Sequence, residues 1–362
     1  MTFFPHLIAG PIVHYRNLIE QFRSTNNRRR SFDVALGLST FVVGLFKKAV
    51  LADAIAGFAS PVFDSVLPRG AAISLIPAWG AALAYTLQLY FDFSGYSDMA
   101  IGLARMFGIR FPRNFDSPYK SRSIIEFWRR WHITLSEFLR DYLYIPLGGN
   151  RRGPARRYAN LFLTMLLGGL WHGAGWTFVV WGGLHGACLI VNHLWLKALP
   201  RDPARRPSWP GAIASQALTF LIVVVGWVFF RAHTCGQALR LLRAMSGADG
   251  VSLPLLLVPR LGSVASTLAH AGIRFEPFDL SYWGGVWEIA WLALGLSIAL
   301  FLPNTQQVFT DITDAPPRTA GLWSRFLWKP NRSWAFMTGS AFTAAVITII
   351  IKNASEFLYF NF

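Results

Sequence analysis

The sequence predicts an all-α polytopic membrane protein, and three observations support this fold class. Of its 362 residues 53% are hydrophobic, with 15 Trp and 30 Phe, which is too apolar and too aromatic for an ordinary soluble domain. Several stretches almost without charge are close to the ~20 residues that a membrane-spanning helix needs. The formal charge of +16 comes from Lys and Arg between these stretches and not from a separate domain, which indicates membrane topology and not nucleic-acid binding.

Five stretches are apolar enough to cross a bilayer as helices, in which backbone groups are satisfied internally. Three of them contain no Lys, Arg, Asp or Glu: Ala71 to Phe91, Gly211 to Phe230 and Trp334 to Ile351. A fourth, Trp283 to Pro303, contains only Glu288. The fifth, Tyr158 to Leu196, also lacks charges and is so long that it must fold back on itself at its glycines.

The first residues predict an irregular entry without a cleavable signal peptide, because Pro5, Gly10 and Pro11 interrupt them. The apolar stretch Val34 to Phe46 is then interrupted by Lys47 and Lys48, which we expect to mark a membrane interface.

Two carboxylates, Asp92 and Asp98, lie among aromatic residues at the end of the next span, where lipid makes charges costly. They form either a proton or ion path, or ion pairs with Arg105 or another interfacial cation. Pairing is the simpler interpretation.

The segment from Arg105 to Arg157 holds twelve Lys or Arg against four Asp or Glu, a bias that marks a cytoplasmic face. Its helical periodicity is clearest from Ser123 to Tyr144, so we expect helices that lie at the interface or dip inward. Prolines also predict an interfacial or re-entrant structure for Val251 to Ile273. With no internal repeat or soluble boundary, residues 1–362 are expected to form a single membrane domain.

The first candidate site is His172, in the Gly168 to Trp176 segment GGLWHGAGW. Burial disfavours a protonated imidazole, so this histidine should stay neutral and able to accept a proton near pH 7. Glycines around it let a substrate approach the backbone. Alternatively, His172 hydrogen-bonds a neighbouring helix and holds the bundle together.

The second candidate site is the Phe127 to Ser136 segment. On one continuous helix Trp128, His132 and Ser136 would share a face, with Arg129 one turn before His132. Such a face would present cations to a phosphate-bearing cofactor. Equally, Trp and Arg together are typical of a helix at the headgroup boundary.

The third candidate is His185, which a single continuous helix would place roughly opposite His172, unless the glycines break that helix. Cys188 lies one turn beyond His185 and is an alternative nucleophile, although packing is the simpler role for it and for Cys235. The sequence shows no phosphate-binding loop, no nucleophile elbow and no His/Cys metal-ligand cluster.

Three segments closely resemble the signature of the membrane-bound O-acyltransferase (MBOAT) family in its alginate O-acetyltransferase branch: Trp128 to Ser136, Leu139 to Asn150 and Leu170 to Ala174. The resemblance extends over nearly the whole chain, through Phe3 to Ile12, Tyr90 to Met99, Asn114 to Ser121 and Phe357 to Phe360. Members of this branch carry further spans before the element resembling Phe3 to Ile12, so we expect this chain to lack the family's first spans.

The resemblance implies an MBOAT-type helical bundle with a central tunnel and interfacial or re-entrant helices. It also implies transfer of an acetyl group from a thioester donor such as acetyl-CoA, with no permanently bound cofactor and no metal. Hydroxyls of an extracellular polysaccharide such as alginate would accept the group, with help from an extracytoplasmic acetyltransferase partner. The expected location is the bacterial cytoplasmic (inner) membrane.

By resemblance His172 is the catalytic residue and His132 the second functional position. A neutral buried imidazole suits a general base that deprotonates a hydroxyl, so we assign that role to His172. His132 would orient it or polarise the thioester carbonyl, and Trp128, Arg129, Arg130 and Trp171 are expected to bind the donor. The alternatives are a proton-coupled transporter or flippase lined by His172, Asp92 and Asp98, and a scaffold of a polysaccharide-export complex.

Overall fold

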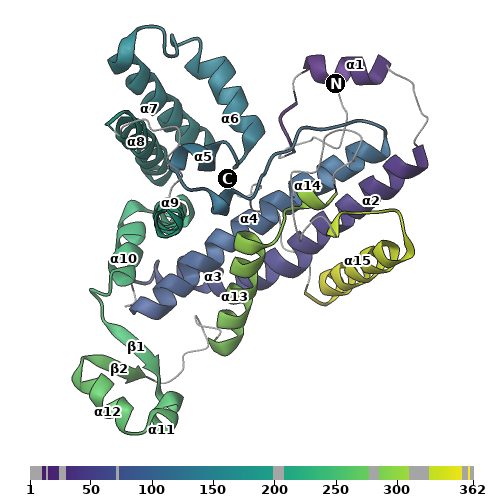
Figure 1. The fold of residues 1–362 in the computed structure, drawn as a ribbon. Helices are drawn as coiled ribbons and strands as arrows, with labels where there is room; N and C mark the ends of the chain where they lie inside the picture. The colour runs from purple at the N-terminus through teal and green to yellow at the C-terminus, as the bar shows by residue number, and fades with distance from the viewer. Residues whose placement is uncertain are drawn as a thin grey trace.

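The structure is a computed structural model that describes residues 10–13, 15–23, 30–70, 73–198, 208–276, 285–309, 326–352 and 358. The motif residues at the two ends of the chain, 3–9, 357, 359 and 360, lie outside this described part. The described residues form a helical bundle with one short two-stranded sheet (Figure 1), which confirms the predicted fold class.

Four helical stretches among the described residues are long and apolar enough to cross a membrane: Arg30–Val66, Trp176–Ala198, Trp209–Arg231 and Arg332–Lys352. The first joins α2 (Arg30–Phe46), the π-helical turn η2 (Lys47–Ala52), α3 (Asp53–Pro61) and η3 (Val62–Val66). The other three are α8, α9 and α15, and α13 (Gly285–Phe301) is a shorter apolar helix. Because several helices are each long enough to cross the bilayer, the protein is expected to pass through the membrane several times.

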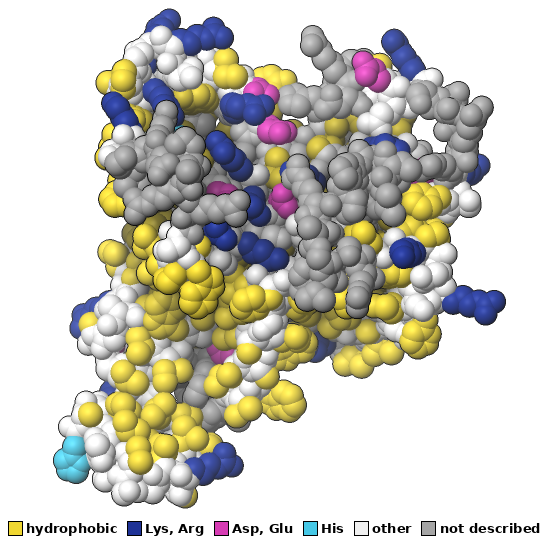
Figure 2. Space-filling view, in the orientation of Figure 1, with side chains coloured by type: hydrophobic (Ala, Val, Ile, Leu, Met, Phe, Trp, Pro, Cys, Tyr) yellow, Lys and Arg dark blue, Asp and Glu magenta, His cyan; other side chains and the backbone are white. Residues whose placement is uncertain are grey.

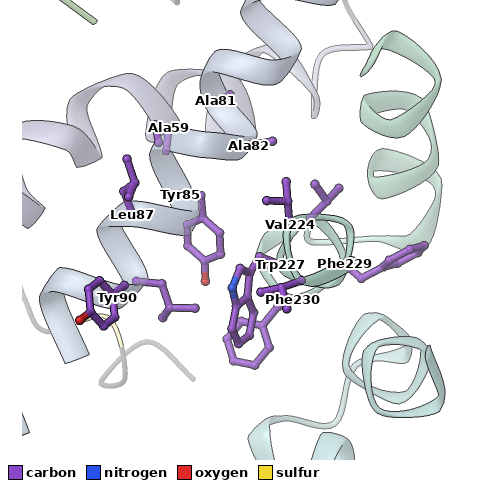
Figure 3. Close-up of a cluster of buried hydrophobic side chains, with 14 of the residues drawn as sticks. Ala59, Ala81, Ala82, Tyr85, Leu87, Tyr90, Val224, Trp227, Phe229 and Phe230 are labelled. Carbon is purple, nitrogen blue, oxygen red and sulfur yellow. The ribbon is translucent and has the colours of Figure 1, made fainter. Parts of the chain in front are cut away.

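Helix α4 (Leu75–Met106) is the centre of the bundle. Its 32 residues extend about 48 Å, more than a bilayer's hydrocarbon core, and most of them are buried. It packs against α2, α3, α9, α10 (Cys235–Met245) and α13. Figure 3 shows Tyr85 of α4 and Trp227 of α9 pointing toward one another in the buried core.

Paired glycines explain how closely α2 and α4 approach. A Cβ atom on Gly37 would clash with the backbone of α4 at Gly102, and one on Gly44 would clash at Gly95. Each α4 glycine in turn faces the α2 backbone. The contact therefore depends on small residues that let two helix backbones touch, as is common in membranes.

The expectation that Lys47 and Lys48 mark an interface is wrong, because both lie in the middle of one continuous apolar helical stretch. Lys47 Nζ lies 2.7 Å from Asp98 Oδ2 on α4. Lys48 Nζ lies 2.8 Å from Asp92 Oδ1. The charges are tolerated inside the bundle because they are paired. The ion-pair interpretation of the two aspartates is therefore confirmed, with lysine partners in place of Arg105.

The charge-free stretch does fold back on itself, as predicted. It forms the hairpin of α7 (Gly153–His172) and α8 (Trp176–Ala198), with the turn at Gly173 to Gly175. Gly169 and Gly182 face each other's helix so closely that a Cβ atom on either would clash with backbone. Figure 1 shows this hairpin beside α5 (Ile124–Trp128) and α6 (Ile133–Leu139), on one side of the long α2–α4 pair.

The Val251 to Ile273 region is predicted to be interfacial or re-entrant, and it contributes to a small lobe at the Leu75 end of α4. Strands β1 (Val251–Pro254) and β2 (Ile273–Glu276) pair in parallel around α11 (Val258–Leu261) and α12 (Ser263–His270). Leu75 N donates to Gly250 O at 3.1 Å, which ties the lobe to α4. The strands were not expected, since prolines interrupt the apolar pattern there. The remaining helices are α1 (Tyr15–Arg23) and α14 (Thr305–Val308).

Candidate active site

His132 does not lie on one continuous helix with Trp128 and Ser136, so the predicted shared face is wrong. The helix ends after Trp128 and a new one begins at Ile133. Between them His132 adopts the left-handed conformation with φ 42° and ψ 56°, which costs a non-glycine residue roughly 1–3 kcal/mol. Surrounding contacts must hold such a residue in place.

Asn114 supplies those contacts. Its backbone carbonyl accepts from Ile133 N at 3.0 Å. Its side-chain Oδ1 accepts from Thr134 N at 3.3 Å and from Thr134 Oγ1 at 2.9 Å. The amide nitrogen Nδ2 donates to Ser97 Oγ on α4 at 3.1 Å. Asn114 therefore fixes the start of α6 and with it the strained backbone of His132.

The same asparagine determines which ring nitrogen of His132 carries the proton. His132 Nδ1 lies 3.1 Å from Asn114 Oδ1. Because the backbone N–H of Thr134 also points at this atom, it must be the amide oxygen, an acceptor. Nδ1 of His132 is therefore the donor, and Nε2 of the neutral ring keeps its lone pair.

His132 is almost fully buried and packs edge-on against Phe93 at 4.7 Å between ring centroids. Burial, with a smaller effect of the nearby His172, lowers the pKa of His132 to about 3. The ring is therefore neutral at physiological pH. The two predicted histidines thus lie within electrostatic range of each other.

His172 is the last residue of α7, next to the glycine turn of the hairpin. Its ring contacts Trp181 of α8 at 5.3 Å and Phe230 of α9 at 5.1 Å, both edge-on. It is buried, with 7% of its surface exposed. Residues of α7, α8 and α9 thus enclose the imidazole of His172, and a small part of its surface stays exposed.

The hairpin brings His185 to the same aromatic side chains, so the glycine break undoes the opposite-face arrangement that a continuous helix would give. Trp181 lies between the two histidines, 5.1 Å from the His185 ring. His185 is fully buried, and neither of its ring nitrogens has a hydrogen-bond partner in the described part of the chain. Cys188 packs against the edge of the core, which favours packing over a nucleophilic role.

A cavity of 480 Å³ opens on the side of the hairpin that faces α5 and α6. Its lining includes three arginines and a histidine, one carboxylate, Glu137, and several apolar side chains. The basic side chains of the lining are Arg129, Arg140, Arg157 and His193, and Trp128 lies among them. Arg157 donates to His193 Nδ1 at 3.2 Å, and Arg129 forms no ion pair among the described residues.

One face of α7 runs from this cavity toward His172. Leu161 and Met165 line the cavity and lie three and two helical turns before His172 on nearly the same face. The rise from Met165 to His172 is about 10 Å. Gly168 lies between them without a side chain. The side chain of Leu139 packs against Gly168, where a Cβ atom would lie 3.2 Å from Leu139 Cδ1, so it separates the cavity from His172 along this face.

The four residues expected to bind the donor do not all lie at one site in the structure. Trp128 and Arg129 line the cavity. Arg130 instead pairs with Glu126 at 2.7 Å and donates to Asp116 O, so it stabilises the local backbone. Trp171 is 62% exposed and only its ring edge meets His172.

Sequence reasoning assigned no role to Asn114, Arg140, Arg157 or His193. Asn114 lies in a segment of family resemblance, which was the only signal for it. Arg157 and His193 are distant in sequence and meet because the hairpin brings α7 and α8 together. In the part of the chain that the structure describes, no three His, Cys, Asp or Glu residues are grouped as metal ligands.

Comparison with known proteins places this site in context. The chain is 50% identical to a peptidoglycan O-acetyltransferase of Helicobacter pylori over 70% of this chain and 47% of that protein. It is 50% identical to a probable alginate O-acetylase of Pseudomonas aeruginosa over 68% and 44% of the two chains. A teichoic acid D-alanyltransferase of Streptococcus thermophilus is 29% identical over 64% and 60%.

The chain spans about half the length of the first two relatives. The model of the membrane-bound O-acyltransferase family matches residues 1–232, which contain His132, Asn114, His172 and the basic cavity. With more than half of its length covered by that match, the chain belongs to the membrane-bound O-acyltransferase family.

Proposed function

We propose that the protein is a membrane-embedded O-acyltransferase that moves an acetyl group from a thioester donor, such as acetyl-CoA, to hydroxyls of an extracellular polysaccharide, such as alginate. The observation that carries this proposal is the pair of buried imidazoles, His132 clamped by Asn114 and His172 at the end of the cavity-lined face of α7. The names of the relatives support acetyl transfer and also offer peptidoglycan as an acceptor.

In this mechanism His172 is the general base. It takes the proton of the acceptor hydroxyl as the oxygen attacks the thioester carbonyl. The new C–O bond forms, the C–S bond breaks, and the leaving thiolate receives the proton. A buried neutral imidazole suits this cycle because it accepts and returns one proton without leaving a charge in the bundle.

The tautomer of His132 favours one of its two expected roles. Its Nδ1 proton is held by Asn114, so Nε2 accepts hydrogen bonds and has no proton to donate to a carbonyl. Polarising the thioester would require a donor. His132 therefore acts by orienting His172 or the acceptor hydroxyl, as an acceptor at a fixed position.

The basic cavity is the candidate entrance for the donor. Arg129 and Arg157 offer guanidinium groups for donor phosphates, with Trp128 beside them, whereas Arg140 is already paired with Asp141 at 2.7 Å. Along this face of α7 an extended thioester arm would reach His172 once the side chain of Leu139, which packs against Gly168, moves aside. The positive charge of the 105–157 segment supports a cytoplasmic position for this entrance. An extracytoplasmic acetyltransferase partner and an inner-membrane location complete the proposal.

The decisive experiment measures transfer of labelled acetyl from acetyl-CoA to extracellular polysaccharide in membranes that carry the wild type, His172→Ala or His270→Ala at matched expression. His270 lies on α12 in the lobe and is a surface control. Loss of a general base is expected to lower the rate about 100-fold or more. The control should match the wild type.

The two alternatives give different outcomes. A scaffold would leave transfer equal in wild type and His172→Ala. A proton-coupled transporter would show no transfer in either membrane, but would acidify or alkalinise vesicles upon addition of substrate. Either pattern contradicts the acyltransferase proposal.

A further inference from the structure

Helices α2 and α15 (Arg332–Lys352) lie side by side and leave a groove of 730 Å³ on the outside of the bundle (Figure 1). Trp328 forms one wall. Its Nε1 donates to Ser39 Oγ at 3.1 Å, and its ring meets Phe32 edge-on at 5.5 Å. The groove is therefore a formed feature, fixed by contacts between α2 and the residues just before α15.

The groove suits a linear apolar chain. Small residues line it, including Ala35 of α2 and Ala335 and Gly339 of α15. A Cβ atom on Gly339 would meet no other atom within 4 Å, so the space beside this glycine is open. From Arg332 to Phe342 the lining extends about 15 Å, which is half of the roughly 30 Å hydrocarbon core and so the depth of one leaflet.

One end of the groove is positively charged. Lys329 and Arg332 line it, both are exposed, and neither pairs with a carboxylate among the described residues. The carboxylate of Asp33 near the start of α2 is already paired with Arg105 at 2.6 Å. Trp334 lies beside the two cations, as is typical of a residue at headgroup level. This end therefore attracts an anion.

The charged end belongs to the side of the bundle that the charge bias assigns to the cytoplasm. The pair of Asp33 with Arg105 joins the start of α2 to the end of α4, where the basic 105–157 segment begins. Figure 2 shows Lys and Arg side chains gathered over the upper half of the molecule and apolar side chains over the lower half. Anionic lipids of the cytoplasmic leaflet are attracted by such basic sites between helices.

We propose that this groove binds an anionic phospholipid of the cytoplasmic leaflet. One acyl chain lies between α2 and α15 against Trp328, and the phosphate contacts Lys329 and Arg332. The helix α15 supports a lipid neighbour, because only 6% of its most apolar window is buried in the protein. The site is separate from the histidines and does not depend on the proposed activity.

The test is native mass spectrometry of the full chain, purified in detergent and stripped of lipid, with phosphatidylglycerol or phosphatidylcholine of identical acyl chains added. The wild type is expected to bind phosphatidylglycerol several-fold more tightly. The double variant Lys329→Gln with Arg332→Gln should bind both lipids equally. Lys352→Gln, at the opposite end of α15, is the charge control and should keep the preference.

A second pair of variants tests the groove itself. Gly339→Leu fills the open space and should lower binding of both lipids, whereas Ser340→Leu, the next exposed residue outside the lining, should not. Size-exclusion elution of each variant checks that it is folded. No preference for phosphatidylglycerol in the wild type, or equal binding by Gly339→Leu and Ser340→Leu, would overturn the proposal, and would indicate a protein segment or bulk lipid over the groove.

Discussion

At the scale of single residues, the site depends on how Asn114 holds His132. One side chain accepts from the imidazole, from a backbone N–H and from a hydroxyl, and donates to α4. It therefore fixes the ring orientation, the tautomer and the strained backbone at once. A residue with this many partners is expected to affect the rate far more than donor affinity, because it touches neither the donor nor the acceptor in the proposed mechanism.

Replacing Asn114 with Leu removes the acceptor for His132 Nδ1 and leaves the N–H of Thr134 without its side-chain partner. We expect kcat for acetyl transfer to fall about 100-fold while KM for the donor changes little. Steady-state kinetics in reconstituted vesicles measure both. Arg129→Gln, which removes a cation from the cavity, should show the reverse pattern, with a raised donor KM. A Leu variant that changes only KM would contradict the positioning role.

Asn114→Asp keeps an acceptor for His132 but adds a charge beside it. A neighbouring carboxylate favours the imidazolium, so the pKa of His132 should rise by roughly one to three units above its value of about 3. The protonated form then persists to higher pH, and the acid limb of the pH–rate profile should move upward. A profile identical to that of the wild type would show that protonation of His132 does not limit the reaction.

At the scale of elements, α2 and α4 are joined both by glycine contacts and by buried ion pairs. The glycines let the backbones touch, and the lysines of η2 reach across to Asp92 and Asp98 of α4. Gln306 adds a hydrogen bond to Asp98 at 2.8 Å, and Leu358 N donates to Asp92 at 3.0 Å. The pair of helices therefore provides the frame from which the site is built.

The glycine contact predicts a sharp difference between two substitutions. Gly95→Leu places a side chain against the α2 backbone and is expected to abolish folded protein, because neither helix can shift without breaking the ion pairs. Gly57→Ala on α3 is the control. A Cβ atom there meets nothing within 4 Å, so stability should stay the same or increase by about 0.5–1 kcal/mol. Fluorescence-detected size exclusion after heating compares the two.

The ion pair of Lys47 with Asp98 predicts that substitutions of its two residues have non-additive effects on stability. Lys47→Met leaves Asp98 without its cation and is expected to destabilise the protein by about 3–5 kcal/mol. The double variant with Asp98→Leu removes the stranded charge and should recover much of that loss. Thermal unfolding of the single and double variants in one detergent measures the coupling. Additive losses would mean that the two charges do not interact.

At the scale of the whole molecule, the bundle has two chemically different ends. The basic segment with the cavity lies at the Met106 end of α4, and the lobe with β1 and β2 lies at the Leu75 end. Helix α4 is longer than the hydrocarbon core but is not one of the four membrane-length apolar stretches, and from its length we expect its two ends to lie on opposite sides of the membrane. The positive-inside rule assigns the basic end to the cytoplasm.

This orientation is tested with single cysteines in a background without Cys188 and Cys235. Arg151→Cys lies in the basic segment and His270→Cys in the lobe, and both positions are exposed. A membrane-impermeant maleimide should label His270→Cys in right-side-out vesicles and Arg151→Cys in inverted ones. The opposite pattern would contradict both the orientation and the cytoplasmic entrance for the donor.

Sequence reasoning was most successful where composition or local pattern decides the structure. Three of the four membrane-length apolar stretches, α8, α9 and α15, and the fold-back of α7 onto α8 were predicted because lipid permits only long apolar helices and glycines mark the break. It failed at His132, where Asn114, eighteen residues earlier, breaks the expected helix. It also failed at Lys47 and Lys48, because their partners lie on another helix about fifty residues away.

The sequence by itself determined the membrane environment and the helical class, and it singled out the two histidines as candidates, because hydropathy, charge bias and family motifs are properties of neighbouring residues. The tautomer of His132, the basic cavity and the pairing of Asp92 and Asp98 were decided only by the tertiary structure. Each of these joins residues from different elements. In a buried, low-dielectric interior, the partner that a polar group meets determines its charge, orientation and chemistry.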